Sequence, residues 1–214
     1  MICRKAAIDS TLGEYYIDFV RENNDGICPF CGLLPLDGEY DPTREAFDHY
    51  LPKSKYPFNS VNLKNLAPSC NKCNSGNKRD KDPLHDKHNN RRKTFYPFSQ
   101  TQPDITLAVS VIEREWSPLT PEKLSIDIQS TDFQDETNTW KELFRIEQRY
   151  AAKCCSPNGG LHWLNRVIDE HQNYNLTRQE MLAAELQSAH SSPWIEANFL
   201  KKAFLEGCEQ AELF

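Results

Sequence analysis

Apolar side chains recur at helical spacing near the start of the chain. The apolar positions of residues 6–24 are Ile8, Leu12, Tyr15, Tyr16, Phe19 and Val20. Steps of three and four residues place them on one face, so we expect a first helix at 6–24. Residues 28–60 have short apolar runs and frequent Pro, Gly, Asp and Asn, which predicts loops and small strands. A short helix is expected at 70–80, after a turn.

The second half of the chain contains segments with strand-like patterns and segments with helical spacing of apolar residues. Residues 105–112 and 124–128 are rich in β-branched residues and predict two strands, which can pair as a hairpin with a long connection. Residues 133–155 carry one broad apolar face and predict a long helix, which ends before Gly159-Gly160. Three further helices are expected near 161–173, 177–190 and 193–209.

Two local signals mark helix starts in this half. Thr177 and Glu180 fit a capping box, and Pro193 after Ser192 fits a first helical residue after its N-cap. The whole pattern predicts an α+β protein. We expect one domain over residues 1–98, which holds most of the Cys and His, and a mainly α-helical region with a small β element over 99–214.

Composition narrows the class of protein. The 214 residues are 38% hydrophobic and 11% aromatic, which is foldable rather than disordered. No apolar run approaches the roughly 18 residues of a membrane span, so no membrane association is expected. The first residues lack the apolar stretch of a secretory signal. We therefore expect a cytoplasmic protein whose cysteines stay reduced.

The net charge of −6 hides a basic block. Residues 48–98 carry 11 Lys/Arg and 4 Asp/Glu. Residues 1–47 carry 4 Lys/Arg and 9 Asp/Glu, and residues 99–214 carry 10 Lys/Arg and 18 Asp/Glu. A basic run is often only a solvated face, but this one overlaps a Cys/His cluster, which favours contact with DNA phosphates. The expected contacts are Lys53, Lys55, Lys72, Lys78, Arg79, Arg91, Arg92 and Lys93. Such binding depends on salt and is mostly blind to sequence.

Four of the eight cysteines form two C-x-x-C pairs, Cys28/Cys31 and Cys70/Cys73. Each pair places two thiolates on one tight turn, and together they supply the four corners of a structural Zn²⁺ site. Disulfides are the alternative, which a reducing compartment disfavours, and one pair alone would also fit a redox motif. The remaining cysteines, Cys3, Cys154, Cys155 and Cys208, are expected to be ordinary thiols.

Polar residues with catalytic potential lie between and after these pairs. Asp48 and His49 are adjacent, so on an extended segment their side chains point to opposite sides. A zinc that ties both ends of the insert would bring Asn74 back towards Asp48. Carboxylate and amide oxygens suit a hard ion such as Mg²⁺, and a neutral His beside such a site can act as a general base.

These residues, in this order, resemble the HNH endonuclease family. The resemblance covers roughly residues 25–80 and rests on the two cysteine pairs together with Asp48-His49, Pro52, Ser54, Asn65-Leu66, Asn74 and Lys78. It implies a ββα-metal core, two strands and a helix that hold one catalytic Mg²⁺ or Mn²⁺. His49 would be the general base, and Asp48 and Asn74 the metal ligands. Asn65 would brace the loop or orient the base.

Some positions of this pattern have alternative assignments. Many family members have His where this chain has Asn74, although Asn is also used there. Asn62 is an alternative to Asn65 as the middle Asn, and the Asn-Leu-Ala-Pro-Ser-Cys spacing favours Asn65. His85 and His88 are either extra ligands or phosphate contacts, or ordinary residues of a basic loop.

The acidic half 99–214 carries no motif. Its large apolar residues, such as Trp116, are expected in a core, and the final Leu213-Phe214 is a candidate docking element. The overall layout resembles the HNH subunits of Septu-like bacterial anti-phage systems, which pair a nuclease with an ABC-type ATPase. That resemblance rests on the Phe-Asp-His-Tyr-Leu-Pro-Lys-Ser stretch at 47–54, Tyr56-Pro57, the Asn-Leu-x-Pro-x-Cys segment at 65–70 and Phe95-Tyr96-Pro97-Phe98. That resemblance implies an ATPase partner bound by the C-terminal half. The alternatives are a standalone nuclease, a latent scaffold, or a non-catalytic zinc module that binds nucleic acid or protein.

Overall fold

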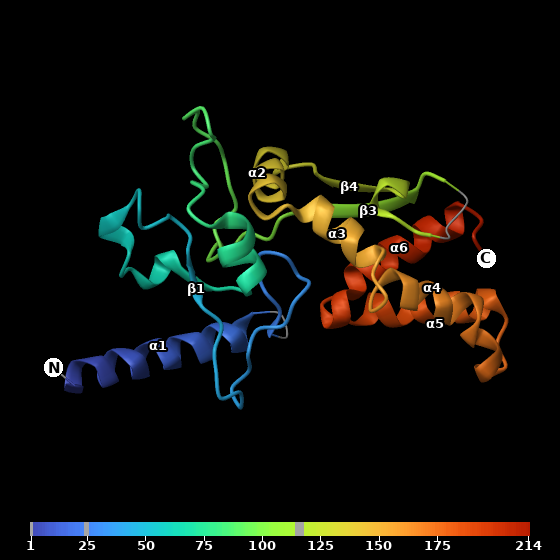
Figure 1. The fold of residues 1–214 in the computed structure, drawn as a ribbon, viewed down its shortest axis with the longest axis horizontal. Coiled ribbons are helices and arrows are strands. Elements are labelled where there is room, and N and C mark those ends of the chain that lie inside the picture. The colour runs from blue at the N-terminus through green and yellow to red at the C-terminus, as the bar shows by residue number, and fades with distance from the viewer. Residues whose placement is uncertain (1, 24–25, 114–117) are drawn as a thin grey trace. The chain divides into compact units, whose positions relative to one another are not determined.

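The computed structural model describes residues 2–23, 26–113 and 118–214, with side chains from residue 11 onward. The chain divides into two compact units, Met1–Gln100 (unit 1) and Thr101–Phe214 (unit 2), and the boundary expected from the sequence lies two residues earlier. Both units mix helices with one small two-stranded sheet (Figure 1), so the α+β class is confirmed.

Unit 1 begins with a long helix that packs on the segment around its sheet. Helix α1 spans Ile2–Glu22, which confirms the first predicted helix. The Tyr15 hydroxyl lies 2.9 and 2.8 Å from the backbone oxygens of Leu63 and Leu66. Tyr16 is buried and meets the Phe47 ring edge-on, with ring centroids 6.0 Å apart. The predicted apolar face therefore anchors α1 on the sheet.

The sheet of unit 1 joins two three-residue strands, β1 (Phe47–His49) and β2 (Leu66–Pro68), in an antiparallel pair. Two 3-10 turns, η2 (Pro57–Asn59) and η3 (Leu63–Asn65), lie in the connection. The helix expected at 70–80 forms as a π-helix, η4 (Lys72–Lys78), rather than an α-helix. Such wide turns are rare and frequently occur at functional sites.

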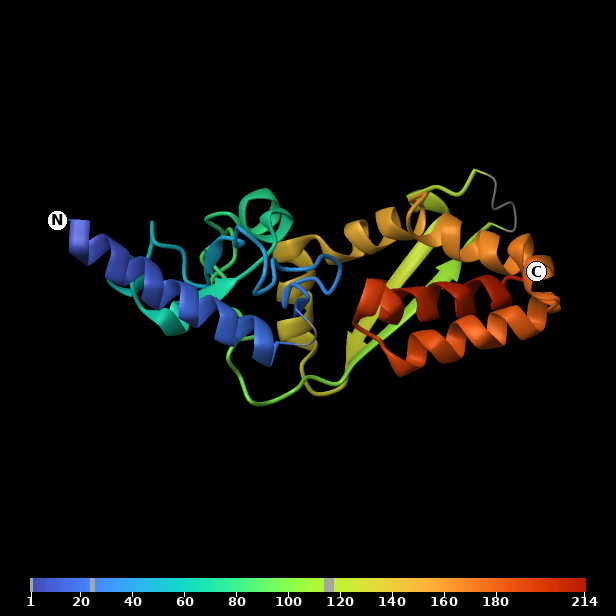
Figure 2. The same cartoon turned by 90° about the horizontal axis from the view of Figure 1, so that it is seen from below.

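Unit 2 is built on a hairpin covered by helices. Strands β3 (Ile105–Val111) and β4 (Leu124–Ser130) pair antiparallel, which confirms both predicted strands. Their connection contains the 3-10 turn η5 (Pro121–Lys123). Val109, Leu124 and Ile128 are buried. Helix α6 (Asn198–Gln210) packs against β3 and crosses the hairpin (Figure 2).

The long helix predicted at 133–155 is wrong, because the chain breaks at Arg145. It forms α2 (Gln134–Phe144) and α3 (Ile146–Cys154), with Arg145 in the left-handed region at φ 51°. In an unbroken helix Phe144 and Ile146 would point about 200° apart. The break lets both be buried, so packing overrides local helix preference.

The remaining helices are α4 (Gly160–Ile168), the 3-10 helix η6 (Glu170–Tyr174) and α5 (Arg178–Ser191). The capping box of Thr177 and Glu180 is present at the start of α5. The helix start predicted at Pro193 is wrong. A 3-10 turn, η7 (Ile195–Ala197), comes first, and Glu196 and Ala197 have φ values of 50° and 60°, which delays α6 to Asn198.

The large apolar residues of unit 2 divide between core and surface. Trp163 and Phe204 are buried, whereas Trp194 is exposed. Trp116 lies outside the described residues. In the part of the chain that the structure describes, no helix has the length and apolar character needed to cross a membrane.

Gly207 is a close-packing point of unit 2, and its replacement should destabilise that unit. A Cβ there would lie 1.9 Å from the backbone oxygen of Val109. We expect Gly207→Ala to lower the free energy of unfolding by about 1–3 kcal/mol. Intrinsic tryptophan fluorescence during urea unfolding measures this, because all four tryptophans belong to unit 2.

Gly13 is the matched control, since it also lies inside a helix but has room for a methyl group. Its Cβ would meet only Arg44 Nη1, at 3.5 Å. Gly13→Ala should therefore stabilise α1 by about 0.5–1 kcal/mol, as helix propensity dictates, with far-UV circular dichroism as the readout. Equal stabilisation by both substitutions would contradict the close approach at Gly207.

Candidate metal sites

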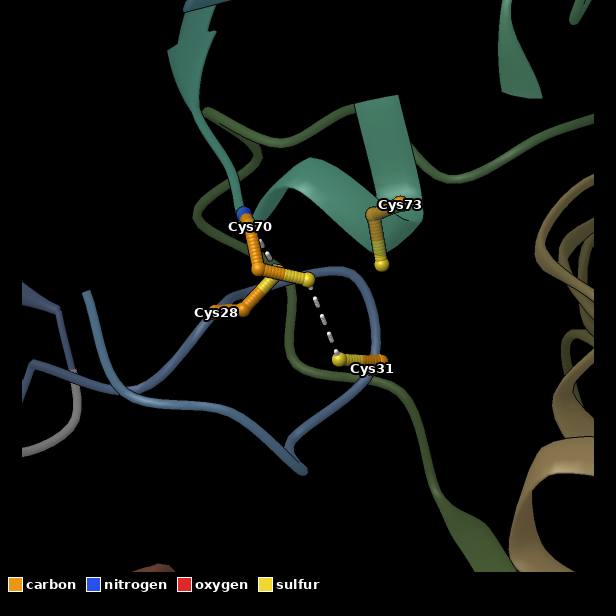
Figure 3. Close-up of side chains that lie close together, drawn as sticks. All are labelled: Cys28, Cys31, Cys70 and Cys73. Atoms are coloured by element: carbon orange, nitrogen blue, oxygen red, sulfur yellow. Dashed lines mark hydrogen bonds between the residues drawn. The ribbon is translucent and has the colours of Figure 1, made fainter. Parts of the chain in front are cut away.

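The four cysteines of the two pairs meet in unit 1 (Figure 3). Cys28, Cys31, Cys70 and Cys73 are all buried, and their sulfur atoms lie within 4.8 Å of one another. The Cys31 and Cys70 sulfurs are 3.9 Å apart. A tetrahedron with zinc–sulfur bonds of about 2.3 Å has edges of about 3.8 Å. The cluster therefore has the size and ligand set of a structural zinc site.

Each cysteine pair sits on a tight backbone turn. Gly32 N donates to Cys28 O at 2.9 Å, and Cys73 N donates to Cys70 O at 2.9 Å. Gly32 follows the first pair with φ 64°, a conformation that glycine adopts without strain. These turns point the sulfur atoms of both pairs at a common centre.

The thiols of this cluster perturb one another. Hydrogen bonding to Cys31 and Cys70 raises the pKa of Cys28, and contact with Cys28 raises the pKa of Cys73. Hydrogen bonding to Cys28 lowers the pKa of Cys70. Four buried thiolates repel one another unless a cation lies among them, and a divalent ion supplies that charge.

The other cysteines form no such cluster within the described residues. Cys154 and Cys208 are buried in unit 2, Cys155 is half-buried, and all three are free thiols. The four clustered cysteines likewise form no disulfide. The side chain of Cys3 lies outside the described part.

An open pocket of about 460 Å³ collects most of the predicted catalytic residues of unit 1. It is lined by Phe47, Asp48, His49, Pro52, Lys53, Ser54, Asn74, Ser75, Arg79 and Asp80. Strand β1 supplies the Asp-His pair, and the π-helix supplies Asn74. The two cysteine turns bring these segments together. Asn74 Nδ2 lies 3.3 Å from Phe47 O.

The ring of His49 is fixed by a backbone carbonyl. Its Nε2 lies 3.1 Å from Ser60 O. A carbonyl oxygen only accepts, so Nε2 carries the proton and donates it. In the neutral ring the lone pair then resides on Nδ1. A His in this tautomer can accept a proton at Nδ1.

Asn65 holds the connection between the strands rather than facing the pocket. Its Oδ1 accepts from Leu51 N at 2.7 Å, and its Nδ2 lies 3.1 Å from Leu51 O and 3.0 Å from Asn59 O. The side chain is buried. Asn65 is therefore a positioning residue that closes the segment holding Ser60 next to His49. Asn62 makes only a local bond to Lys64 N.

Asp48 is paired with a buried lysine. Lys78 Nζ lies 3.1 and 3.0 Å from the two carboxylate oxygens of Asp48, and it donates to His49 O at 2.6 Å. Both side chains are at most 2% exposed. Burial raises the pKa of the Asp48 carboxyl, and the charge of Lys78 opposes that effect. Oδ2 of Asp48 makes no hydrogen bond of its own.

The expected DNA contact by Lys78 is therefore wrong, because a buried ammonium with three oxygen neighbours cannot reach a phosphate. Arg92 is half-buried and donates to Asp82 O at 2.7 Å. The other basic residues predicted to contact DNA are exposed, namely Lys53, Lys55, Lys72, Arg79, Arg91 and Lys93. Lys53 and Arg79 also line the pocket.

His85 belongs to a separate polar cluster. Its Nδ1 lies 3.3 Å from Asp82 Oδ2, which also accepts from the Tyr56 hydroxyl at 2.9 Å. His88 is exposed next to Asp86, whose carboxylate accepts from His88 N at 2.8 Å. Neither histidine is among the residues that line the pocket in the described part of unit 1.

Sequence reasoning missed the partners that fix the site. Lys78 follows Asn74 by four residues on a short helix, so a shared face was the available signal. No signal in the sequence pointed to the Ser60 carbonyl, because its contact with His49 depends on how the connection between the strands folds. Ser75 and Asp80 at the pocket were also missed.

Comparison with known proteins finds one distant similarity. Protein ea31 of Escherichia phage lambda is 26% identical over 185 residues, which is 86% of this chain. The chain spans 57% of the length of that protein. No protein-family model and no solved structure matches the chain. The similarity extends over parts of both units, because neither unit alone has 185 residues.

Loss of one cluster cysteine should release a bound metal. We expect about one zinc per purified chain and none in Cys73→Ser, whose site lacks its fourth ligand. Metal analysis by mass spectrometry measures this. Cys155→Ser is the control and should keep its zinc. A metal-free parent, or a Cys73→Ser chain that keeps zinc, would contradict the site.

Removal of the Lys78 ammonium should destabilise unit 1. Lys78→Met leaves the Asp48 charge buried without a partner, which costs about 3–5 kcal/mol. Urea unfolding followed by far-UV circular dichroism measures the loss. Adding Asp48→Asn should recover most of it, because the stranded charge is then gone. The exposed Lys72→Met is the control, and an equal effect of both lysine substitutions would contradict the buried pair.

Proposed function

We propose that unit 1 is a metal-dependent nuclease of the HNH type that hydrolyses phosphodiester bonds of DNA. The observation that carries the proposal is the setting of His49. Its ring is fixed through Nε2 by Ser60 O, and it shares one pocket with Asp48 and Asn74. A base beside two oxygen donors serves hydrolysis, whereas a module that only binds has no need of it.

His49 is assigned the role of general base. With Nε2–H committed to Ser60, Nδ1 accepts a proton from a water, and the oxygen of that water attacks phosphorus. The bond from phosphorus to the 3′-oxygen then breaks, its electron pair stays on that oxygen, and the oxygen takes up a proton from solvent. Asn65 acts at a distance, since it closes the segment that holds Ser60.

The remaining pocket groups fit a catalytic Mg²⁺ or Mn²⁺. Asp48 and Asn74 would hold it through two hard donors, a carboxylate oxygen that is ion-paired with Lys78 but makes no hydrogen bond, and an amide oxygen. When bound, the ion polarises the phosphate and stabilises the leaving oxygen. Lys78 already offsets the charge of Asp48, so affinity for the free ion should be weak.

Substrate binding is assigned to the exposed basic residues. Lys53 and Arg79 line the pocket itself, where they can contact the phosphate that is cleaved. From His49 to Arg79 the sequence has six Lys/Arg and no Asp/Glu. The anti-phage role and the ABC-type ATPase partner of unit 2 stay predictions from the resemblance.

Replacing the base should stop cleavage without loss of fold. We expect the parent to nick supercoiled plasmid with Mg²⁺ or Mn²⁺, and His49→Ala to be about 10²–10⁴-fold slower. Gel analysis of nicked product over time measures the rates. His49→Ala should keep its zinc content and its circular dichroism spectrum.

His190→Ala is the matched control, since His190 is an exposed histidine of unit 2, and it should nick like the parent. Equal nicking by His49→Ala and the parent would refute the assignment of the base. A parent that binds zinc and DNA but never nicks would favour the non-catalytic module instead.

A further inference from the structure

The connection between β1 and β2 carries apolar side chains into solvent. Phe58 is 98% exposed and Val61 is 86% exposed, and Leu63 nearby is also exposed. Burying a phenylalanine side chain ordinarily stabilises a fold, and the folded chain forgoes that gain here. Single exposed apolar residues are common, but three within six residues form an apolar ridge, Phe58–Leu63.

The ridge is held by hydrogen bonds, so its exposure does not arise from a loose loop. Ser60 Oγ donates to Pro57 O at 2.7 Å, and Asn62 N donates to Asn59 O at 3.2 Å. Asn65 Nδ2 lies 3.0 Å from Asn59 O. These bonds lie on both sides of Phe58 and keep its ring on an ordered turn.

The ridge adjoins the proposed catalytic base. Ser60, two residues from Phe58, accepts the hydrogen bond of the His49 ring. The start of the same connection, at Pro52 and Lys53, lines the pocket. The ridge therefore lies on the segment whose carbonyl fixes the His49 ring.

The segment that carries the ridge is basic, and one of its lysines, Lys55, lies 3.9 Å from the Asp82 carboxylate. Residues 51–65 contain Lys53, Lys55 and Lys64 and no acidic residue. All three lysines are exposed. An apolar projection among cations matches DNA, which presents phosphates outside and flat apolar bases inside.

We propose that Phe58, supported by Val61, is a wedge that enters the base stack of DNA beside the phosphodiester held at His49. The inference rests on the proposed nuclease function and names its substrate class, which is DNA with a step that opens easily. Insertion unstacks a base step and kinks the duplex. Unstacking costs least at flexible pyrimidine–purine steps, at mismatches and in single strands, so the protein should prefer these substrates.

The test uses the full chain with His49→Ala, so that the DNA stays intact. The probe is a duplex with 2-aminopurine at a TA step, whose fluorescence rises several-fold when the base unstacks. We expect that rise with His49→Ala and its loss when Phe58→Ala is added, with binding about ten- to a hundredfold weaker. Phe58→Trp should restore both signals, because a flat ring is retained.

Tyr40→Ala is the matched control, since Tyr40 is an aromatic residue of unit 1 that is 96% exposed. It should leave fluorescence and affinity unchanged. An unchanged signal with Phe58→Ala would overturn the wedge. Binding of the chain to anionic lipid vesicles that is lost with Phe58→Ala, without any 2-aminopurine signal, would overturn it in favour of a membrane surface.

Failure of the wedge and failure of the nuclease are distinguishable. A parent that nicks plasmid while Phe58→Ala nicks equally well and no base unstacks contradicts the wedge alone. A parent that never nicks, but unstacks 2-aminopurine through Phe58, contradicts the nuclease and supports a wedge in a DNA-binding module.

Discussion

Four sulfur atoms from segments 38 residues apart determine where the polar groups of unit 1 lie. Cys70 follows β2 by two residues, and Cys73 directly precedes Asn74. Joining the pairs therefore packs the π-helix against β1. Without a metal, four thiolates at this spacing would repel one another. With zinc, metal binding contributes directly to folding and to assembly of the pocket.

The buried Asp48–Lys78 pair is the second consequence of that arrangement. The π-helix brings Lys78 under β1, where it contacts the Asp48 carboxylate and the His49 carbonyl at once. A buried ion pair adds little net stability but is costly to break. It fixes the strand that carries His49, and it offsets the negative charge of Asp48. In the proposed function, a cation at Asp48 would therefore depend on substrate phosphate for part of its binding.

Sequence reasoning predicted what depends on spacing alone. The cysteine cluster, the hairpin of unit 2 and the capping box of Thr177 follow from local patterns, and the structure contains all three. Predictions from the sequence failed where tertiary packing decides the local structure. Arg145 breaks a periodic helix so that Phe144 and Ile146 can both be buried. Lys78 looked like one more cation of a basic block, because the sequence does not reveal which lysine turns inward.

The proposed function requires that Asp48 and Asn74 hold a cation beside His49 in a zinc-stabilised pocket. Anomalous diffraction at the manganese edge tests this requirement, on crystals of the His49→Ala chain grown with Mn²⁺ and a short DNA duplex. We expect one manganese peak bonded to oxygens of Asp48, Asn74 and a DNA phosphate, separate from a zinc peak among the four cysteines. A pocket without manganese, with the phosphate elsewhere on the protein, would refute the proposed metal site.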